Sequence, residues 1–365
     1  MTEILLTIFF ISVLLIFLGS GIWVAISMVG VSSIGMMLFT TRPVGDAMAT
    51  TIWGASSSWT LTALPLFVWM GEILFRTKLS ENLFEGLSPW MQKLPGGLVH
   101  VNVVGCALFA AISGSSAATV ATVGKMSIPE LRKRKYPESI LLGSLAGSGT
   151  LGLLIPPSII LIIYGVTVQE SIAKLFIAGI VPGIMIALIF MTYVMIWSLI
   201  NKKSMPTFKQ DFSLMEKVRK SGKLIPVILL IVSVIGSIYT GIATATEAAS
   251  LGVVGALILS YFQKSLSLRT FKESLLGATK TSCMIAFILA GATFLSLAMG
   301  FTGLPRNLAL WIEGMELSPY VLIFVLMIFY IILGMFLDGI SAVVLTMAII
   351  EPMIRQAGFD MIWFG

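Results

Sequence analysis

Two polar, helix-breaking segments lie inside long apolar stretches of this chain. The first is Ser-Gly-Ser-Ser at 113–116, and the second runs over 147–158 and contains adjacent prolines. Lipid cannot satisfy backbone groups that a helix break frees, so such breaks occur only where they are buried in protein or line a watery cavity. Secondary transporters build ion and substrate sites from broken helices of this kind. The breaks therefore favour a solute transporter.

The composition independently predicts a membrane protein. Of the 365 residues, 57% are hydrophobic and 11% are charged, whereas soluble domains carry about 25% charged residues. Several apolar stretches reach the roughly 20 residues that cross a bilayer. No cleavable signal sequence precedes them. Cys106 and Cys283 lie in apolar segments and are interpreted as packing residues, and we expect no cofactor.

The basic residues indicate topology. Of the 23 Lys and Arg, 19 lie in four segments, at 76–93, 125–135, 202–223 and 264–280. Basic loops remain in the cytoplasm, which places the N-terminus in the periplasm. The net charge of +6 is thus explained by orientation in the lipid bilayer, and we expect no nucleic-acid partner.

These loops divide the chain into spans. The predicted elements are helices at 4–20, 22–39 and 53–75, a hairpin at 98–128, a broken helix at 140–165, a helix at 172–200 and a basic cytoplasmic linker at 201–223. Both ends of the hairpin adjoin basic loops, so it is predicted to be re-entrant. The fold class is all-α and polytopic.

The second half echoes the first. Gly19-Ser20 returns as Gly236-Ser237, and the Ser-Gly-Ser-Ser-Ala run at 113–117 returns as Asp-Gly-Ile-Ser-Ala at 338–342. The first half starts in the periplasm, whereas the linker makes the second half start in the cytoplasm. The two halves, 1–200 and 224–365, are therefore predicted to form an inverted repeat of the elevator type. Scaffold helices would lie at 4–39 and 224–262, and mobile segments at 98–165 and 282–365. The second hairpin falls at about 320–354, and no broken helix follows it, which predicts a C-terminally truncated product or a fragment.

Several motifs together resemble one family. They are SGSSAAT at 113–119, GTLGLLIPPS at 149–158, LFIAGIVPG at 175–183, TEAA at 246–249 and GMFLDG at 334–339. This combination is similar to the large membrane subunit of tripartite ATP-independent periplasmic (TRAP) transporters, over essentially the whole chain. Ala348 stands where that family often has proline, and Glu351 stands where an apolar residue is usual.

The resemblance implies sodium-driven uptake of organic acids, such as C4-dicarboxylates, sugar acids or sialic acid, across the bacterial inner membrane. It also implies two protein partners, a small four-helix membrane subunit and a periplasmic substrate-binding protein. Family members usually continue into a second broken helix.

The helix breaks predict the sites. Carbonyl and hydroxyl oxygens can supply the about five or six hard ligands that a dehydrated sodium ion needs, and the N-terminus of the half-helix beyond the break, at 117–119, suits a carboxylate. The predicted sodium ligands are Ser113, Gly114, Ser115, Thr150, Pro156, Asp338 and Gly339. The predicted substrate-binding residues are Ser115, Ser116, Thr119, Pro157 and Ser341.

Each motif also has a structural interpretation. The small residues at 113–116 are typical of a helix-packing face. The adjacent prolines are typical of a kinked helix, and Asp338 is typical of a residue that caps a helix. Glu247 is a cap or an ion ligand. Glu72 is interpreted as an interfacial residue or a subunit contact.

Three functional hypotheses remain. The first is a sodium-coupled transporter subunit, since no Walker motif for ATP is present. The second is a non-transporting, truncated remnant of that fold. The third is a membrane-embedded enzyme. A His-Glu-x-x-His metal motif needs two histidines, and His100 is the only one in the sequence. We therefore predict no catalytic residues.

Overall fold

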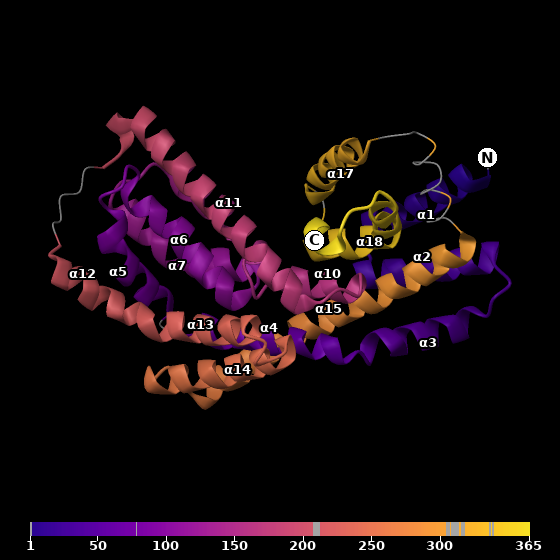
Figure 1. The fold of residues 1–365 in the computed structure, drawn as a ribbon, viewed down its shortest axis with the longest axis horizontal. Coiled ribbons are helices and arrows are strands. Elements are labelled where there is room, and N and C mark those ends of the chain that lie inside the picture. Colours follow the sequence, from indigo (N-terminus) through magenta and orange to yellow (C-terminus); the bar gives the residue numbers. More distant parts are fainter. Residues whose placement is uncertain are drawn as a thin grey trace. The chain divides into compact units, whose positions relative to one another are not determined.

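The computed structural model describes residues 2–77, 79–206, 212–303, 307, 314, 318–335, 337 and 339–365. Within these ranges the regular elements are all helices (Figure 1). Five helices are long and apolar enough to cross a membrane, and the number rises to seven if each of two bent pairs is one span. The prediction of an all-α polytopic membrane protein is confirmed.

The chain forms two compact units. Unit 1 comprises Met1–Leu61, Ile163–Ser171 and Thr281–Gly365, and unit 2 comprises Thr62–Ile162 and Ile172–Lys280. Each unit therefore takes residues from both sequence halves. Such a division does not bear on internal symmetry, and the inverted repeat at 1–200 and 224–365 stays a prediction.

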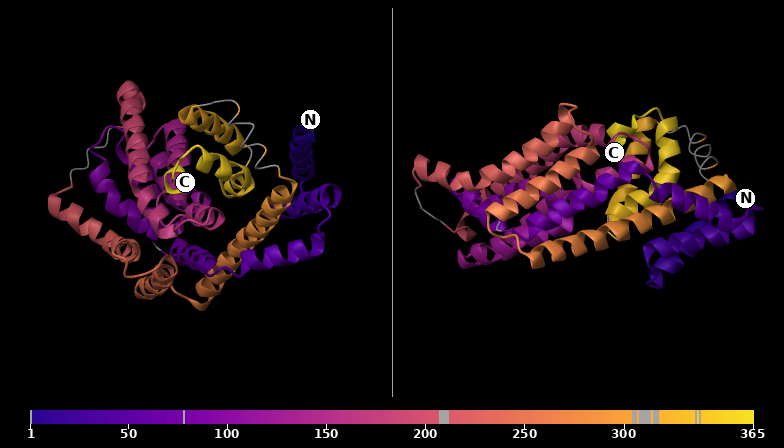
Figure 2. Two further views of the ribbon diagram at one scale, coloured as in Figure 1. Left: turned by 45° about the vertical axis from the view of Figure 1, so that its right-hand side comes forward. Right: turned by 90° about the horizontal axis from the view of Figure 1, so that it is seen from below.

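Unit 2 is built around the first hairpin. Its helices are α4 (Ala63–Phe75), α5 (Leu79–Met91), α6 (His100–Ser113), α7 (Ser116–Lys133), α8 (Glu138–Gly149), α9 (Leu151–Leu154), α11 (Ile172–Ile200), α12 (Leu214–Ser221), α13 (Ile225–Tyr239) and α14 (Ala245–Phe262). Helix α6 contacts α7, α8 and α11 (Figures 1 and 2). Phe67 on α4 meets Phe176 on α11 edge to face at 5.9 Å between ring centroids. This aromatic pair helps to form the core against which the hairpin packs.

Unit 1 contains the chain's first and last helices. They are α1 (Thr2–Gly19), α2 (Val24–Phe39), α3 (Val44–Ser56), α17 (Pro319–Gly334), α18 (Gly339–Gln356) and α19 (Met361–Phe364). Two helices have residues in both units: α10 (Ile159–Thr167) and α15 (Leu268–Thr302). Met36, Phe294 and Ala298 form a fully buried core cluster in unit 1. A Cβ on Gly291 would lie 2.8 Å from the Ala25 carbonyl oxygen, so only glycine permits α15 to approach α2 this closely.

The predicted span at 53–75 is wrong in one respect. Helix α3 ends at Ser56, and a bend of 53° separates it from the segment Trp59–Phe75. The bend falls in a run of three serines, whose hydroxyls compete for backbone groups and weaken helices. The helix predicted at 172–200 coincides with α11.

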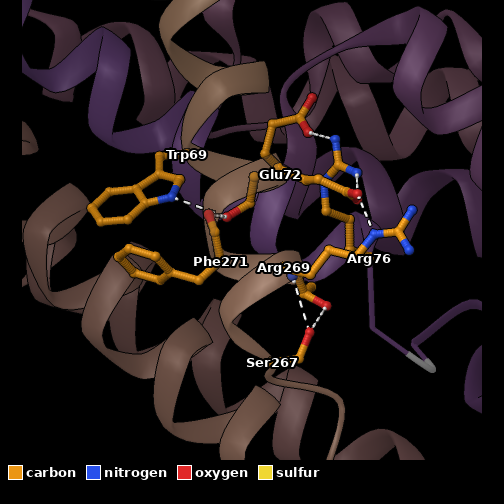
Figure 3. Close-up of polar contacts among 9 residues, drawn as sticks. Trp69, Glu72, Arg76, Ser267, Arg269 and Phe271 are labelled. Atoms are coloured by element: carbon orange, nitrogen blue, oxygen red, sulfur yellow. Dashed lines mark hydrogen bonds and ion pairs between the residues drawn. The ribbon is translucent and has the colours of Figure 1, made fainter.

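A charged network joins α4 to the start of α15 within unit 2 (Figure 3). Arg76 Nη2 lies 3.0 Å from Glu72, and Arg76 Nη1 lies 3.2 Å from Glu273. Arg269 Nε lies 2.8 Å from the second oxygen of Glu273. Trp69 Nε1 donates to Ser274 Oγ nearby at 3.3 Å. Glu72 therefore has partners within the chain, which replaces the interpretation of Glu72 as an interfacial or subunit-contacting residue.

Replacing the central cation should destabilise unit 2 more than replacing the outer one. Arg76→Met leaves Glu72, whose side chain is 25% exposed, without its partner, and we expect a loss of about 1–2 kcal/mol in the free energy of unfolding. Arg269, 88% exposed, is the matched control, and Arg269→Met should cost less than about 0.5 kcal/mol. Unfolding titrations in mixed detergent measure both values, and equal losses would contradict the central role of Arg76.

Candidate functional site

The first hairpin turns at a two-residue break. Helix α6 ends at Ser113, and Gly114 adopts a left-handed conformation with φ of 58°, from which its N–H donates to the Ala110 carbonyl at 3.0 Å. Ser115 is extended and caps α7, since its hydroxyl accepts from the Ala118 N–H at 3.4 Å. Glycine adopts this left-handed conformation without steric cost, and a side chain here would also meet the Pro157 carbonyl oxygen, 2.6 Å from an added Cβ. The break thus follows directly from the local sequence.

A chain of hydroxyls closes this tip from inside. Thr119 Oγ1 donates to the Ser115 carbonyl at 2.7 Å and lies 3.0 Å from Ser113 Oγ. Ser113 Oγ also donates to the Ser115 carbonyl at 3.4 Å, and either hydroxyl can be the donor between Ser113 and Thr119. Ser113 and Thr119 are buried. Together they fix the tip without any formal charge.

The second break follows the same logic. Helix α8 ends at Gly149, the single turn α9 ends at Leu154, and α10 starts at Ile159. Pro157 has no N–H for the Leu153 carbonyl, and the Ser158 hydroxyl donates to that carbonyl instead. One of the carbonyls that the sequence predicted to be free is thereby occupied.

The two breaks meet in unit 2. The Ile159 N–H donates to the Gly114 carbonyl at 3.3 Å. A Cβ on Gly114 would lie 2.6 Å from the Pro157 carbonyl oxygen, and one on Gly152 would lie 2.8 Å from the Ser115 carbonyl oxygen. Backbone oxygens of both breaks therefore gather at one junction, which glycines at both positions make possible.

The structure brings some predicted residues together and not others. Ser113, Gly114, Ser115, Thr119 and Pro157 meet at the junction, and Ser116 adjoins it through Gly152, whose added Cβ would lie 2.9 Å from the Ser116 nitrogen. In contrast, the Thr150 hydroxyl is exposed and donates back to the Gly147 carbonyl at 2.7 Å. Pro156 is buried, with its Cγ 3.7 Å from a Cβ built on Gly179 of α11.

The predicted residues of the second hairpin belong to unit 1. Asp338 lies outside the described residues. Gly339 is the first residue of α18, and Ser341, two residues later, is buried. These two residues are described within unit 1 only, so their relation to the junction remains a prediction.

One buried polar side chain was not predicted from the sequence. Asn102 Nδ2 on α6 donates to Ser144 Oγ at 3.0 Å and to the Leu141 carbonyl at 3.2 Å. Its Oδ1 is buried and has no hydrogen-bond partner among the described residues. Ser148 Oγ donates to the Ser144 carbonyl at 2.6 Å. An asparagine inside an apolar span was the available signal, but sequence reasoning followed only the helix breaks.

Glu247 has a capping role. Its carboxylate accepts from the Thr244 N–H at 2.8 Å, and the Thr244 hydroxyl accepts from the Glu247 N–H at 3.3 Å. This reciprocal capping box starts α14. It accounts for Glu247 without an ion.

Comparison with known proteins gives a consistent result. A family model described as the DctM component of tripartite ATP-independent periplasmic transporters matches residues 10–365. The chain is 32% identical over 331 residues to the C4-dicarboxylate TRAP transporter large permease protein DctM of Pseudomonas aeruginosa. The matched region covers 90% of this chain and 77% of that relative.

Two further relatives have different named substrates. The 2,3-diketo-L-gulonate TRAP transporter large permease protein YiaN of Escherichia coli is 32% identical over 321 residues, covering 87% of this chain and 74% of the relative. The ectoine/5-hydroxyectoine TRAP transporter large permease protein UehC of Ruegeria pomeroyi is 31% identical over 363 residues, covering 98% and 83%.

The junction predicts a position that does not tolerate a side chain. Gly114→Ala places a Cβ in the left-handed region and against the Pro157 carbonyl, and should cost about 1–3 kcal/mol in the free energy of unfolding. Gly143→Ala in α8 is the control, because its Cβ meets nothing within 4 Å and alanine favours helix by up to about 1 kcal/mol. Detergent unfolding midpoints should move in opposite directions; a tolerated Gly114→Ala would contradict the close junction.

Proposed function

Because the chain belongs to the DctM family of tripartite ATP-independent periplasmic transporters, we propose that it carries an organic acid across the bacterial inner membrane, driven by a sodium gradient. Membership makes it a multi-pass membrane transport protein and not an enzyme, so the hypothesis of a membrane-embedded enzyme is rejected. Sodium coupling and the class of solute are the proposal.

The junction of the two breaks is the observation that supports this function best. The carbonyl groups of Gly114, Ser115 and Pro157 all take part in the contact between the two breaks, and none carries a formal charge. Sodium is a hard cation that prefers such oxygens. Carbonyls and hydroxyls can bind it without burying a carboxylate that would need a permanent partner.

The start of α7 supports an anionic solute. Its first N–H groups lie next to Ser115, and a helix N-terminus favours a carboxylate. The relatives named above are described as transporters of C4-dicarboxylate, 2,3-diketo-L-gulonate and ectoine. A carboxylate is common to these three solutes, so we assign an organic acid to this chain.

The proposal includes two protein partners and a movement. The family's tripartite character supports a small membrane subunit and a periplasmic binding protein that delivers the solute. Segments 98–165 and 282–365 would move as the mobile part against the scaffold at 4–39 and 224–262. Substrate and ion would travel with the mobile segments.

Uptake of labelled organic acids into proteoliposomes tests the function. The liposomes contain this chain with its small subunit, and the cognate binding protein and an inward sodium gradient are supplied outside. We expect uptake that stops when sodium is replaced by potassium or the gradient is collapsed. Uptake that is equal in potassium would contradict sodium coupling, and no uptake of any organic acid would contradict the assigned solute class.

The tip serines should affect the sodium dependence. Ser115→Ala removes one candidate ligand, and we expect the sodium concentration for half-maximal uptake to rise about tenfold, the effect of roughly 1.4 kcal/mol. Ser250→Ala is the matched control, since that exposed hydroxyl donates to the Thr246 carbonyl of its own helix, and it should leave the sodium dependence unchanged. If both variants behave like the parent protein, the tip is a packing element only.

A further inference from the structure

Unit 1 contains a polar cavity that the proposed function does not use. Its volume is about 660 Å³, and its walls come from the end of α3 and the turn after it, from α10 and the loop that follows, and from α15 and α18. Hydroxyl groups and carboxylates from these four segments line it. The residues that the argument uses are Ser58, Thr60, Ser296, Glu170 and Glu351.

One arginine serves both carboxylates. Arg355 Nε donates to Glu351 Oε1 at 2.9 Å, and Arg355 Nη2 lies 3.7 Å from Glu170 Oε1. The same Nη2 donates to the Val168 carbonyl at 3.2 Å. Glu170 and Glu351 line the cavity, and Arg355 pairs with them from α18. The group therefore carries one negative charge in excess.

Each carboxylate retains an oxygen for a ligand. Among the described residues, the hydrogen bonds and ion pairs of Glu170 and Glu351 involve only their Oε1 atoms. The two side chains are 27% and 28% exposed, so water screens them only in part. An uncompensated negative charge in a partly enclosed space attracts cations and repels anions.

The size of the cavity selects an organic ligand. Small-molecule pockets span about 300–1,000 Å³, and this cavity falls in that range, whereas a water-sized ion needs only about 30 Å³. Ser58, Thr60 and Ser296 provide hydroxyls that can donate to a second polar group of the same ligand. A solute with a cationic group and a separate acceptor group fits both features.

We propose that this cavity binds a zwitterionic organic acid. The ammonium group pairs with Glu351 and Glu170, and the carboxylate accepts hydrogen bonds from the hydroxyls on α15 and on the turn after α3. The inference does not rest on the proposed function, which places its ion and its solute at the junction in unit 2. Binding itself does not require transport.

Two probes of equal length test the charge preference. 4-Aminobutyrate and succinate both have four carbon atoms, and in 4-aminobutyrate a cationic aminomethyl group (CH2–NH3⁺) takes the place of one carboxylate of succinate. Equilibrium dialysis against the purified full chain in nanodiscs of neutral lipid measures their dissociation constants. We expect 4-aminobutyrate to bind at least tenfold more tightly. Equal binding, tighter binding of succinate, or no binding of either probe overturns the proposal.

Variants with opposite expected effects on binding identify the cavity as the site. Glu351→Gln and Glu170→Gln should each weaken 4-aminobutyrate binding about tenfold, because the excess charge is lost. Arg355→Gln should strengthen it, since the group then carries two excess charges, and a merely misfolded variant cannot show that gain. Asp46→Asn is the control, an exposed carboxylate on α3 outside this cavity, and should change nothing. Unchanged binding in both glutamine variants overturns the proposal.

Uptake measured on the same preparations separates the two proposals. If 4-aminobutyrate binds as expected but no sodium-driven uptake occurs, the transport function fails and the binding site stands. If succinate or another acid without an amino group is taken up with sodium while Glu351→Gln leaves every affinity unchanged, the zwitterion site fails and the transport function stands.

Discussion

The need to satisfy backbone polar groups inside a membrane governs this structure. Each helix break in unit 2 frees N–H and carbonyl groups that lipid cannot bind, and three of these carbonyls accept hydrogen bonds from groups within the chain. Ser158 takes the carbonyl that Pro157 cannot use, Thr119 takes that of Ser115, and Ile159 takes that of Gly114. Because the third bond runs between the breaks, satisfying the backbone also assembles the junction.

Sequence reasoning was most successful where local chemistry decides the structure. The break at 113–116 was predicted because glycine and serine disfavour a continuous helix, and α11 was predicted because an apolar stretch has clear ends. The bend after Ser56 was missed, since three serines inside an apolar segment are also compatible with a straight helix. The apolar character of the segment therefore does not distinguish a bent helix from a straight one.

Long-range partners were beyond the sequence. Glu72 and Arg76 are one helical turn apart, so the sequence does indicate that pair, but Glu273 is 197 positions from Arg76 and nothing local indicates that it shares this arginine. Asn102 escaped notice since its partners on α8 become neighbours only when the hairpin packs. Spacing in sequence reports local geometry and not such encounters.

The hydroxyl chain at the tip has a consequence for how ligands become available. The Ser115 carbonyl already accepts the Thr119 hydrogen on one of its two lone pairs. A cation can approach the second lone pair while that hydrogen bond stays in place. If the cation displaces the hydrogen instead, rotation of the hydroxyl directs a Thr119 lone pair toward the place that the hydrogen left. The cation then gains two oxygens in one torsional step, without any backbone displacement.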